Sequence, residues 1–330
     1  MVLPVVVPLA GALLGFLVWP RAAAVVGVAA SGLVLASVGW LCVRVRSGGP
    51  AVYELAGWDA PLGIELRADG LAAVMLLMTA VVGTASSAYA MGYFAHRREK
   101  DPGPLSVEGS FWPLWMFLWA SLNALYLSAD AFNLYVALEL LGLSSAALVG
   151  LGRTRAAFRA AMRYLLVSLL GSLAYLVGVA LLYGGFGTLS LQGLGERISA
   201  GPTAWTAIAL ITLGMALKTA LLPLHAWLPP AYASALAPVS ALLSGLGVKA
   251  SFYLLLRLWF EVFPGVLVPA AGQLLGGLGA AAIVWGSVMA LRQRSIKMLL
   301  AYSSVGKIGY LFLVFSLAGS AGSAAWSGGV

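Results

Sequence analysis

The sequence predicts an all-α membrane protein that crosses the bilayer about ten times. Of its 330 residues, 62% are hydrophobic and only 9% are charged, whereas soluble chains carry about a quarter charged residues. The mean hydropathy is +0.97. The apolar residues come in runs of about 18 to 25, each long enough to cross roughly 30 Å of hydrocarbon. These observations exclude a water-soluble globular domain.

The boundaries of the expected spans are marked by charged residues, Pro and Gly. The predicted spans are residues 2–20, 22–43, 71–95, 111–129, 131–150, 164–184, 204–223, 236–258, 266–291 and 298–318. The first span lacks a positively charged leader region and an obvious cleavage site, so we expect a retained helix. The polar segment 44–70 is expected to be an ordered external loop, and no separate soluble domain is predicted.

Lys and Arg residues are distributed unequally between alternate loops. The richer set comprises Arg21, Arg97, Arg98, Lys100, Arg153, Arg155, Arg159, Arg163, Arg292, Arg294 and Lys297. The poorer set comprises Arg44, Arg46, Arg67, Arg197 and Arg257. Basic residues in short loops stay cytoplasmic, which predicts a multi-pass plasma-membrane protein with both termini outside. Because these residues flank apolar runs, we interpret the net charge of +8 as a signal that orients the chain in a lipid bilayer. We therefore expect no nucleic-acid partner.

The sequence holds few of the residues that bind redox centres. One cysteine, Cys42, and two histidines, His96 and His225, are too few for a disulfide framework, a structural zinc site or an iron–sulfur cluster. We therefore expect no metal, cofactor or catalytic centre in this chain. Any redox centre would lie on a partner.

Four charged residues lie inside predicted spans: Glu139, Lys218, Lys249 and Lys307. Each costs roughly 2.5–3.5 kcal/mol at the centre of a membrane helix, so each is expected to face the bundle interior, to pair or to line water. One glutamate cannot neutralise three lysines, so at least one lysine is expected to titrate near neutral pH. This imbalance favours proton carriers over a static ion pair for the first three residues, and leaves both interpretations open for Lys307.

A predicted helix break follows the first of these lysines. Pro223 comes five residues after Lys218, and proline removes a backbone donor at membrane depth, which is tolerated beside a hydrated cavity or inside protein. Broken helices are a common device of transporters. His225 follows, as a proton-transfer group or as a structural histidine. Hydroxyl groups nearby could either hydrogen-bond between packed helices or support a water relay, and we favour the packing role. They belong to Ser240, Ser244, Ser251, Ser303 and Ser304.

Several stretches resemble a known family of proton-conducting transporters. It includes the antiporter-like membrane proteins of respiratory complex I, of Mrp-type Na⁺/H⁺ antiporters and of membrane-bound hydrogenases. The matching stretches are residues 130–145, 218–229, 237–249 and 296–310. The resemblance implies a 14-helix fold with two inverted five-helix repeats. It divides the chain into residues 1–110 (helices one to three and the external loop), 111–258 (the first repeat, with its broken helix at 218–230) and 266–330 (the start of the second).

The resemblance also implies roles for single residues. Glu139 resembles the acidic member of the first repeat's pair, Lys218 its broken-helix lysine, and Lys249 the central lysine that passes protons onward. Lys307 stands where relatives often carry His or Gln, and Pro230 stands where many carry Asp. Relatives continue to a second broken helix, so the end at Val330, with its span-like approach over residues 324–330, predicts a truncated chain.

By this resemblance the chain is expected to be a proton-translocating membrane subunit of a larger assembly. The assembly would be of the NADH–quinone oxidoreductase, membrane-bound hydrogenase or Mrp antiporter type, and flavin, iron–sulfur clusters and quinone would lie on partner subunits. Two alternatives stay open: a structural membrane anchor that transports nothing, and an independent small-solute transporter.

Overall fold

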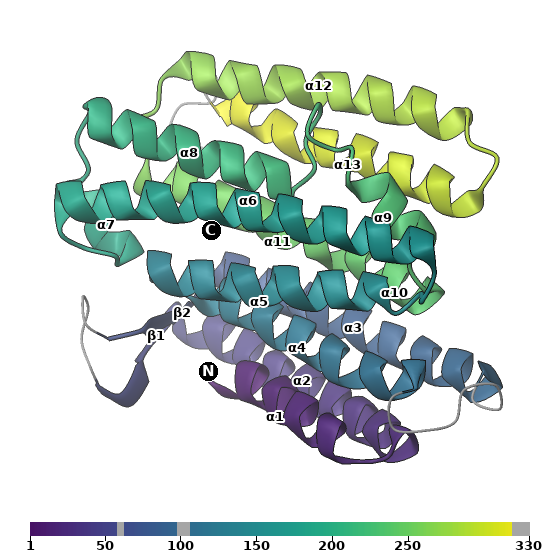
Figure 1. The fold of residues 1–330 in the computed structure, drawn as a ribbon. Coiled ribbons are helices and arrows are strands. Elements are labelled where there is room, and N and C mark those ends of the chain that lie inside the picture. Colours follow the sequence, from purple (N-terminus) through teal and green to yellow (C-terminus); the bar gives the residue numbers. More distant parts are fainter. Residues whose placement is uncertain (58–62, 98–105, 319–330) are drawn as a thin grey trace.

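The chain forms a layered array of long helices lying side by side (Figure 1). The computed structural model describes residues 1–57, 63–97 and 106–318. Arg98, Lys100, residues 58–62 of the predicted external loop and the span-like residues 324–330 lie outside these ranges. Helices α1 to α4 form one group and α12 with α13 lies farthest from it, on the other side of α5, α6 and α8.

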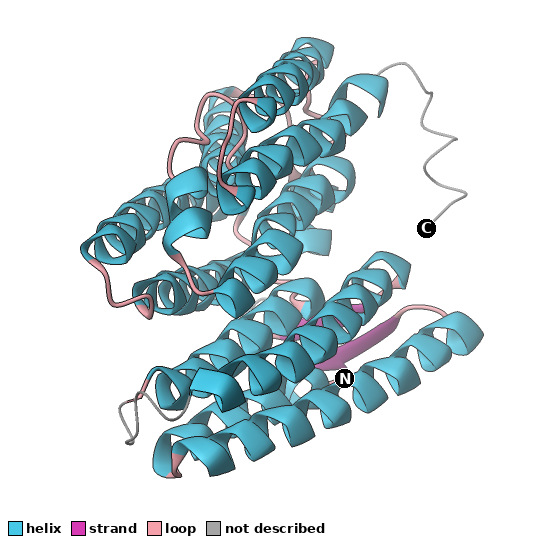
Figure 2. Ribbon diagram, turned by 90° about the vertical axis from the view of Figure 1, so that its right-hand side faces the viewer, coloured by secondary structure: helices cyan, strands magenta, loops and turns pink. Residues whose placement is uncertain are grey.

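The N-terminal group contains four long helices and a small hairpin. Its elements are α1 (Leu3–Leu17), α2 (Pro20–Gly48), β1 (Ala51–Glu54), η1 (Leu55–Gly57), β2 (Glu65–Ala68), α3 (Gly70–Arg97) and α4 (Val107–Leu127). The strands pair antiparallel, with Ala51 opposite Ala68 and Glu54 opposite Glu65. In its described part, the polar segment predicted as an ordered loop therefore contains a pair of strands, and β2 packs against α3 and α4 (Figure 2).

The remaining elements include one long helix that is interrupted by π turns. They are α5 (Ala131–Gly150), α6 (Arg155–Phe186), α7 (Leu191–Arg197), α8 (Pro202–Lys218), α9 (Leu228–Ser234), α10 (Ala237–Leu242), η3 (Leu243–Gly247), α11 (Val248–Arg257), η4 (Leu258–Val262), α12 (Pro269–Leu291) and α13 (Ile296–Ala318). Elements α10 to η4 form one continuous span, Ala237–Val262. Its two π turns, η3 and η4, belong to a class that often marks functional sites.

Local sequence signals explain where these helices begin. The side chains of Ser106, Asp130 and Thr154 accept hydrogen bonds from backbone N–H groups in the first turns of α4, α5 and α6. Such caps satisfy donors that a helix leaves open at its start. Proline occupies the first helical position of α2, α8 and α12, where its missing N–H costs nothing.

The helical membrane class is confirmed, whereas the count of about ten spans is not. Among the described residues, seven helices are long and apolar enough to cross a bilayer: α2, α3, α5, α6, Ala237–Val262, α12 and Ile296–Leu317 of α13. Helices α1 and α8 are apolar but shorter. The predicted span at residues 111–129 coincides with α4, which is not among the seven.

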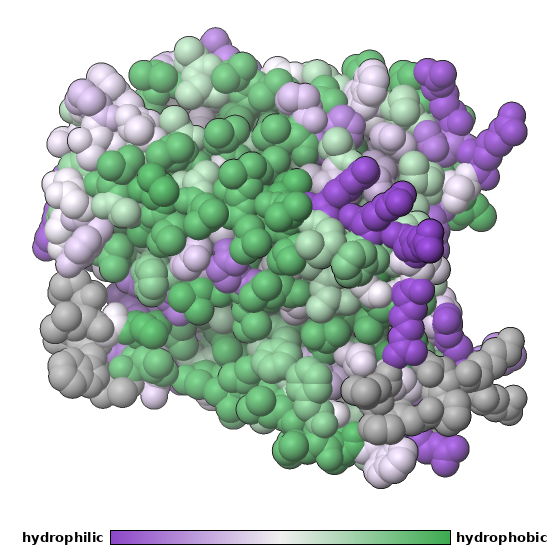
Figure 3. Space-filling view, viewed as in Figure 1, coloured by the Kyte–Doolittle hydropathy of each residue, from purple (hydrophilic) through white to green (hydrophobic). Residues whose placement is uncertain are grey.

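The surface has the distribution that a bilayer requires. Hydrophobic side chains cover the middle of the face in Figure 3, and strongly hydrophilic ones gather at one end. At that end α2, α6 and α13 begin (Figure 1), with basic residues such as Arg21, Arg155 and Lys297 in their first turns. The first described residue and the end of α13 lie at the opposite end, with the hairpin.

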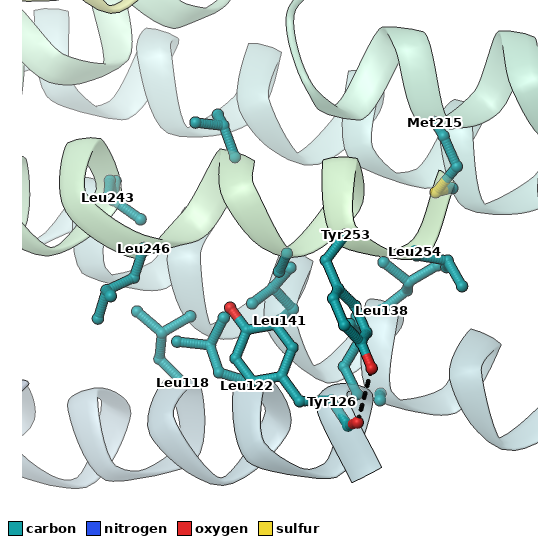
Figure 4. Close-up of a cluster of buried hydrophobic side chains, with 14 of the residues drawn as sticks. Leu118, Leu122, Tyr126, Leu138, Leu141, Met215, Leu243, Leu246, Tyr253 and Leu254 are labelled. Carbon is teal, nitrogen blue, oxygen red and sulfur yellow. Dashed lines mark hydrogen bonds between the residues drawn. The ribbon is translucent and has the colours of Figure 1, made fainter. Parts of the chain in front are cut away.

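A buried apolar core connects the N-terminal group to the interrupted helix. Figure 4 shows side chains of α4, α5 and α8 packed against η3 and α11. Within it, the Tyr253 hydroxyl of α11 donates a hydrogen bond to the Tyr126 carbonyl of α4, at 2.9 Å. This core fixes the face that α11 presents to its neighbours.

Candidate functional site: a buried lysine at a helix break

Lys218 is the last residue of α8, and the chain leaves helical geometry there until α9 begins at Leu228. The break lies where Pro223 predicts it. Two side chains bond to carbonyls at the end of α8: the Trp227 indole donates to Leu217 O at 3.0 Å, and the Thr219 hydroxyl donates to Met215 O at 2.9 Å. A helix C-terminus carries partial negative charge, which favours an ammonium at this position.

The Lys218 side chain is 6% exposed and is held between α5 and α6. Its Nζ donates to Ser168 Oγ of α6 at 2.9 Å and to Leu138 O of α5 at 3.4 Å. Close packing of α6 on α8 makes this possible: a Cβ on Gly171 would lie 2.9 Å from both Gly214 O and Lys218 Cγ. A side chain at Gly171 would therefore push α8 and its lysine away.

Glu139 follows Leu138 on α5 and is half-buried. Its carboxylate is near enough to Lys218 for the opposite charges to attract each other. Among the described residues, however, the two groups form no ion pair within 4.0 Å. The structure therefore shows Lys218 bonded to neutral oxygens, with its acidic neighbour nearby but not engaged.

A small cavity adjoins Lys218 and leads towards the helix that carries Lys249. Its volume is about 10 Å³, which is about the space that one water molecule needs. It is lined by Leu141, Tyr164, Val167, Ser168, Lys218, Trp227, Gly247 and Ser251. Gly247 and Ser251 lie two residues before and two residues after Lys249. One water molecule in this cavity would therefore lie between α8, which carries Lys218, and α11, which carries Lys249.

Lys249 lies just after the π turn η3 and is half-buried. Its Nζ donates to the Ser244 carbonyl within that turn. The positive charge of Lys249 also interacts with that of Lys307 on α13. The Lys307 side chain is exposed on the described part of the chain, so of the three expected environments it does not occupy the bundle interior there; pairing and contact with water stay predictions.

The other predicted residues lie at the edge of this group. The Trp285 indole of α12 donates to His225 Nε2 at 3.1 Å, and His225 Nδ1 is buried. The hydroxyls of Ser240, Ser244 and Ser304 bond to backbone carbonyls. Ser303 is half-buried. Of the five serines, only Ser251 lines the cavity.

A buried charge cluster at the hairpin end of α11 was not predicted from the sequence. Arg257 is 4% exposed and forms two hydrogen bonds to the Asp69 carboxylate, at 2.8 and 2.9 Å. It also donates to Glu261 at 2.8 Å and to the Tyr253 hydroxyl at 2.8 Å. Arg67 lies 3.6 Å from Asp69 and 3.5 Å from Glu261. The cluster joins β2 and the connection that follows it to α11 and η4.

The Asp69 carboxylate, which lies in the connection between β2 and α3, is stabilised in its charged form. Burial raises the pKa of Asp69, but hydrogen bonds and positive charge from Arg257, the N–H of Ala72 and the charge of Arg67 together lower this pKa below its ordinary value of 3.8. The sequence contains one signal for the cluster. Lys249, Tyr253, Arg257 and Glu261 recur every four residues, the spacing of one helix face.

The donor groups of the chain do not form a metal site within the described ranges. No three His, Cys, Asp or Glu side chains come together there. Oppositely charged side chains come into contact in the Arg257 cluster, while at the helix break Lys218 bonds to neutral oxygens. Together these features define a polytopic helical membrane protein with a lysine buried at a broken helix.

The chain belongs to the NADH:quinone oxidoreductase/Mrp antiporter transmembrane family, whose model matches residues 128–328. It is 37% identical over 295 residues to NADH-quinone oxidoreductase subunit N of Desulforudis audaxviator, a match that covers 88% of this chain and 56% of that protein. The chain thus spans little more than half the length of this relative.

Two solved structures show the same arrangement of helices. One is the membrane-bound sulfane sulfur reductase, an archaeal respiratory membrane complex, with a TM-score of 0.87, 29% identity and coverage of 96% of this chain and 64% of that chain. The other is the Mrp complex from Dietzia sp., with a TM-score of 0.85, 28% identity and coverage of 96% and 58%. The antiporter-like fold expected from the sequence motifs is thereby supported.

Proposed function

We propose that this chain is a proton-translocating subunit of a multisubunit membrane complex, and that Glu139, Lys218 and Lys249 carry the proton relay. Membership of a family that includes complex I subunit N supports this proposal. The single observation that carries it is the placement of Lys218: a buried ammonium at a helix break, close to a carboxylate and beside a cavity the size of one water molecule.

The relay acts through charge. Attraction to Glu139 retains the proton on Lys218, and weakening of that attraction releases the proton towards the cavity. A water molecule in the cavity, together with the Ser251 hydroxyl, connects Lys218 to the helix of Lys249. Repulsion from Lys307 promotes onward transfer. Moving one charge through 150 mV costs about 3.5 kcal/mol, which is comparable to the interaction of one close ion pair near a protein surface.

The surroundings of the relay belong to the same proposal. Both termini lie outside the plasma membrane, because the end where α2, α6 and α13 begin is rich in basic residues. Residues 111–258 form the first repeat, and residues from 266 onward begin the second. Other membrane subunits complete the complex, and flavin, iron–sulfur clusters and quinone, where the complex is redox-driven, belong to them.

A charge-neutral substitution in the relay tests the proposal. In inverted membrane vesicles that contain the assembled complex, Glu139→Gln is expected to lower proton flux about tenfold, which corresponds to about 1.4 kcal/mol of barrier. The matched control is Glu196→Gln on α7, whose carboxylate is exposed and bonds only to Gln192 among the described residues. Normal assembly with unchanged flux in the Glu139 variant would favour a structural anchor.

A further inference from the structure

The Ser168 hydroxyl accepts the shorter of the two hydrogen bonds that Lys218 donates. The Nζ to Oγ distance is 2.9 Å, against 3.4 Å to Leu138 O. Ser168 lies in the middle of α6, and its own carbonyl accepts a hydrogen bond from Ser172 one turn later, at 3.0 Å. The hydroxyl lines the same cavity as Lys218 and Ser251. It thus contacts the ammonium beside the cavity that Ser251 of α11 also lines.

Gly142 on α5 provides the space for this hydroxyl. A Cβ at position 142 would lie 2.3 Å from Ser168 Oγ and 3.8 Å from Lys218 Nζ. Gly142 is three residues after Glu139, so both lie on the same face of α5. One helix face therefore presents to Lys218 a carboxylate and, one turn later, a gap that the Ser168 hydroxyl fills.

We propose that Ser168 is the positioning residue that accepts the Lys218 ammonium when it is not paired with Glu139, so that Lys218 exchanges between these two acceptors during transport. The proposal rests on the proposed function and assigns a role to a residue outside its relay. The structure shows the state in which Lys218 bonds to Ser168 and makes no ion pair with Glu139.

The chemistry of the two acceptors explains why both are needed. A buried ammonium without an acceptor is costly, so leaving Glu139 requires a second oxygen within reach. A hydroxyl is neutral and binds an ammonium less strongly than a carboxylate does. Ser168 can therefore hold Lys218 without trapping it.

Proton flux in vesicles that contain the assembled complex tests this role. Ser168→Ala is expected to lower proton flux about tenfold, because one hydrogen bond to a charged group contributes at least about a factor of ten to an equilibrium. Ser168→Thr keeps the hydroxyl and is expected to retain most of the wild-type flux. The matched control is Ser172→Ala, which removes a buried hydroxyl of α6 that bonds, within the described part of the chain, only to its own helix. The flux of this variant should stay near that of the wild type.

A double-mutant cycle separates positioning from packing. Removing Ser168 matters because Lys218 then stays with Glu139, so Ser168→Ala added to Glu139→Gln should cost far less than Ser168→Ala alone. Equal losses in both backgrounds, or flux in Ser168→Ala like that in Ser172→Ala, would overturn the inference. If Lys218→Met abolishes flux in that same assay, the proposed function stands although the inference fails; if it does not, both fail.

Discussion

Replacing Lys218 by alanine should reduce proton flux through the assembled complex by at least about 100-fold, the lower end of what a positioned proton donor contributes. The ammonium is the only charged group that lines the cavity among the described residues. Neither Ser168 nor Ser251 can replace it, because a hydroxyl does not hold an extra proton near neutral pH. The measurement is the rate of dye-reported acidification in inverted vesicles, normalised to the amount of assembled complex.

Two variants make this result interpretable. Lys218→Met keeps a long unbranched side chain and removes only the charge, so it separates loss of the proton carrier from loss of packing. Lys297→Ala removes a lysine whose Nζ bonds to Ala235 O at 2.6 Å, at the end of α9, and should transport normally. A Lys218→Met variant with wild-type flux and normal assembly would contradict the relay.

The second large effect is on stability. Arg257→Ala is expected to lower the free energy of unfolding by about 3–5 kcal/mol, the usual cost of breaking a buried ion pair by removing one partner. The Asp69 carboxylate would stay buried without its two strongest donors. The midpoint of thermal unfolding in detergent measures the change, and Arg67→Ala is the control. Because Arg67 is one-third exposed and its contacts are 3.5 Å or longer, its loss should cost about 0–1 kcal/mol.

The pH dependence of this effect follows from the lowered pKa of Asp69. A carboxylate with a lowered folded-state pKa stabilises the protein above its unfolded-state value of about 3.9, and this stability is lost as pH falls through the lower folded value. Removing Arg257 leaves the buried Asp69 carboxylate with less positive charge beside it, so the folded-state pKa of Asp69 is higher in Arg257→Ala than in the wild type. The stability difference between the two proteins should therefore shrink as pH falls through this higher value, and a difference that stays unchanged between pH 8 and about pH 3 would contradict this assignment.

The sequence predicted those parts of the site that follow from single residues in apolar runs. Lys218 and Glu139 are identifiable because a charge inside a membrane span needs a partner. The break after Lys218 is identifiable because Pro223 cannot continue a helix. Each of these inferences needs only local chemistry, and the structure brings the two charged residues near each other.

The contacts that the sequence did not predict join residues distant in the chain. Asp69 and Arg257 are 188 positions apart, and no pattern in either segment predicts that the two residues pair. Ser168 cannot be distinguished from the other serines in the sequence, because its role depends on contacts with Gly142 and Lys218 that only the fold creates. The exposure of the Lys307 side chain was not predicted for the same reason. The rotation of α13 about its axis depends on packing against α9 and α12, and a helix that is apolar on all sides does not show in its sequence which side faces its neighbours.

The most direct measurement of the central claim is proton flux through the assembled complex with Lys249→Ala, compared with Ser244→Ala. Lys249 lies beyond the cavity, and its Nζ bonds to the carbonyl of Ser244, so the serine variant leaves that bond in place. The relay predicts that the lysine variant loses nearly all flux while the serine variant keeps it. Equal flux in the wild type and both variants, with normal assembly, would contradict a path from Lys218 to Lys249.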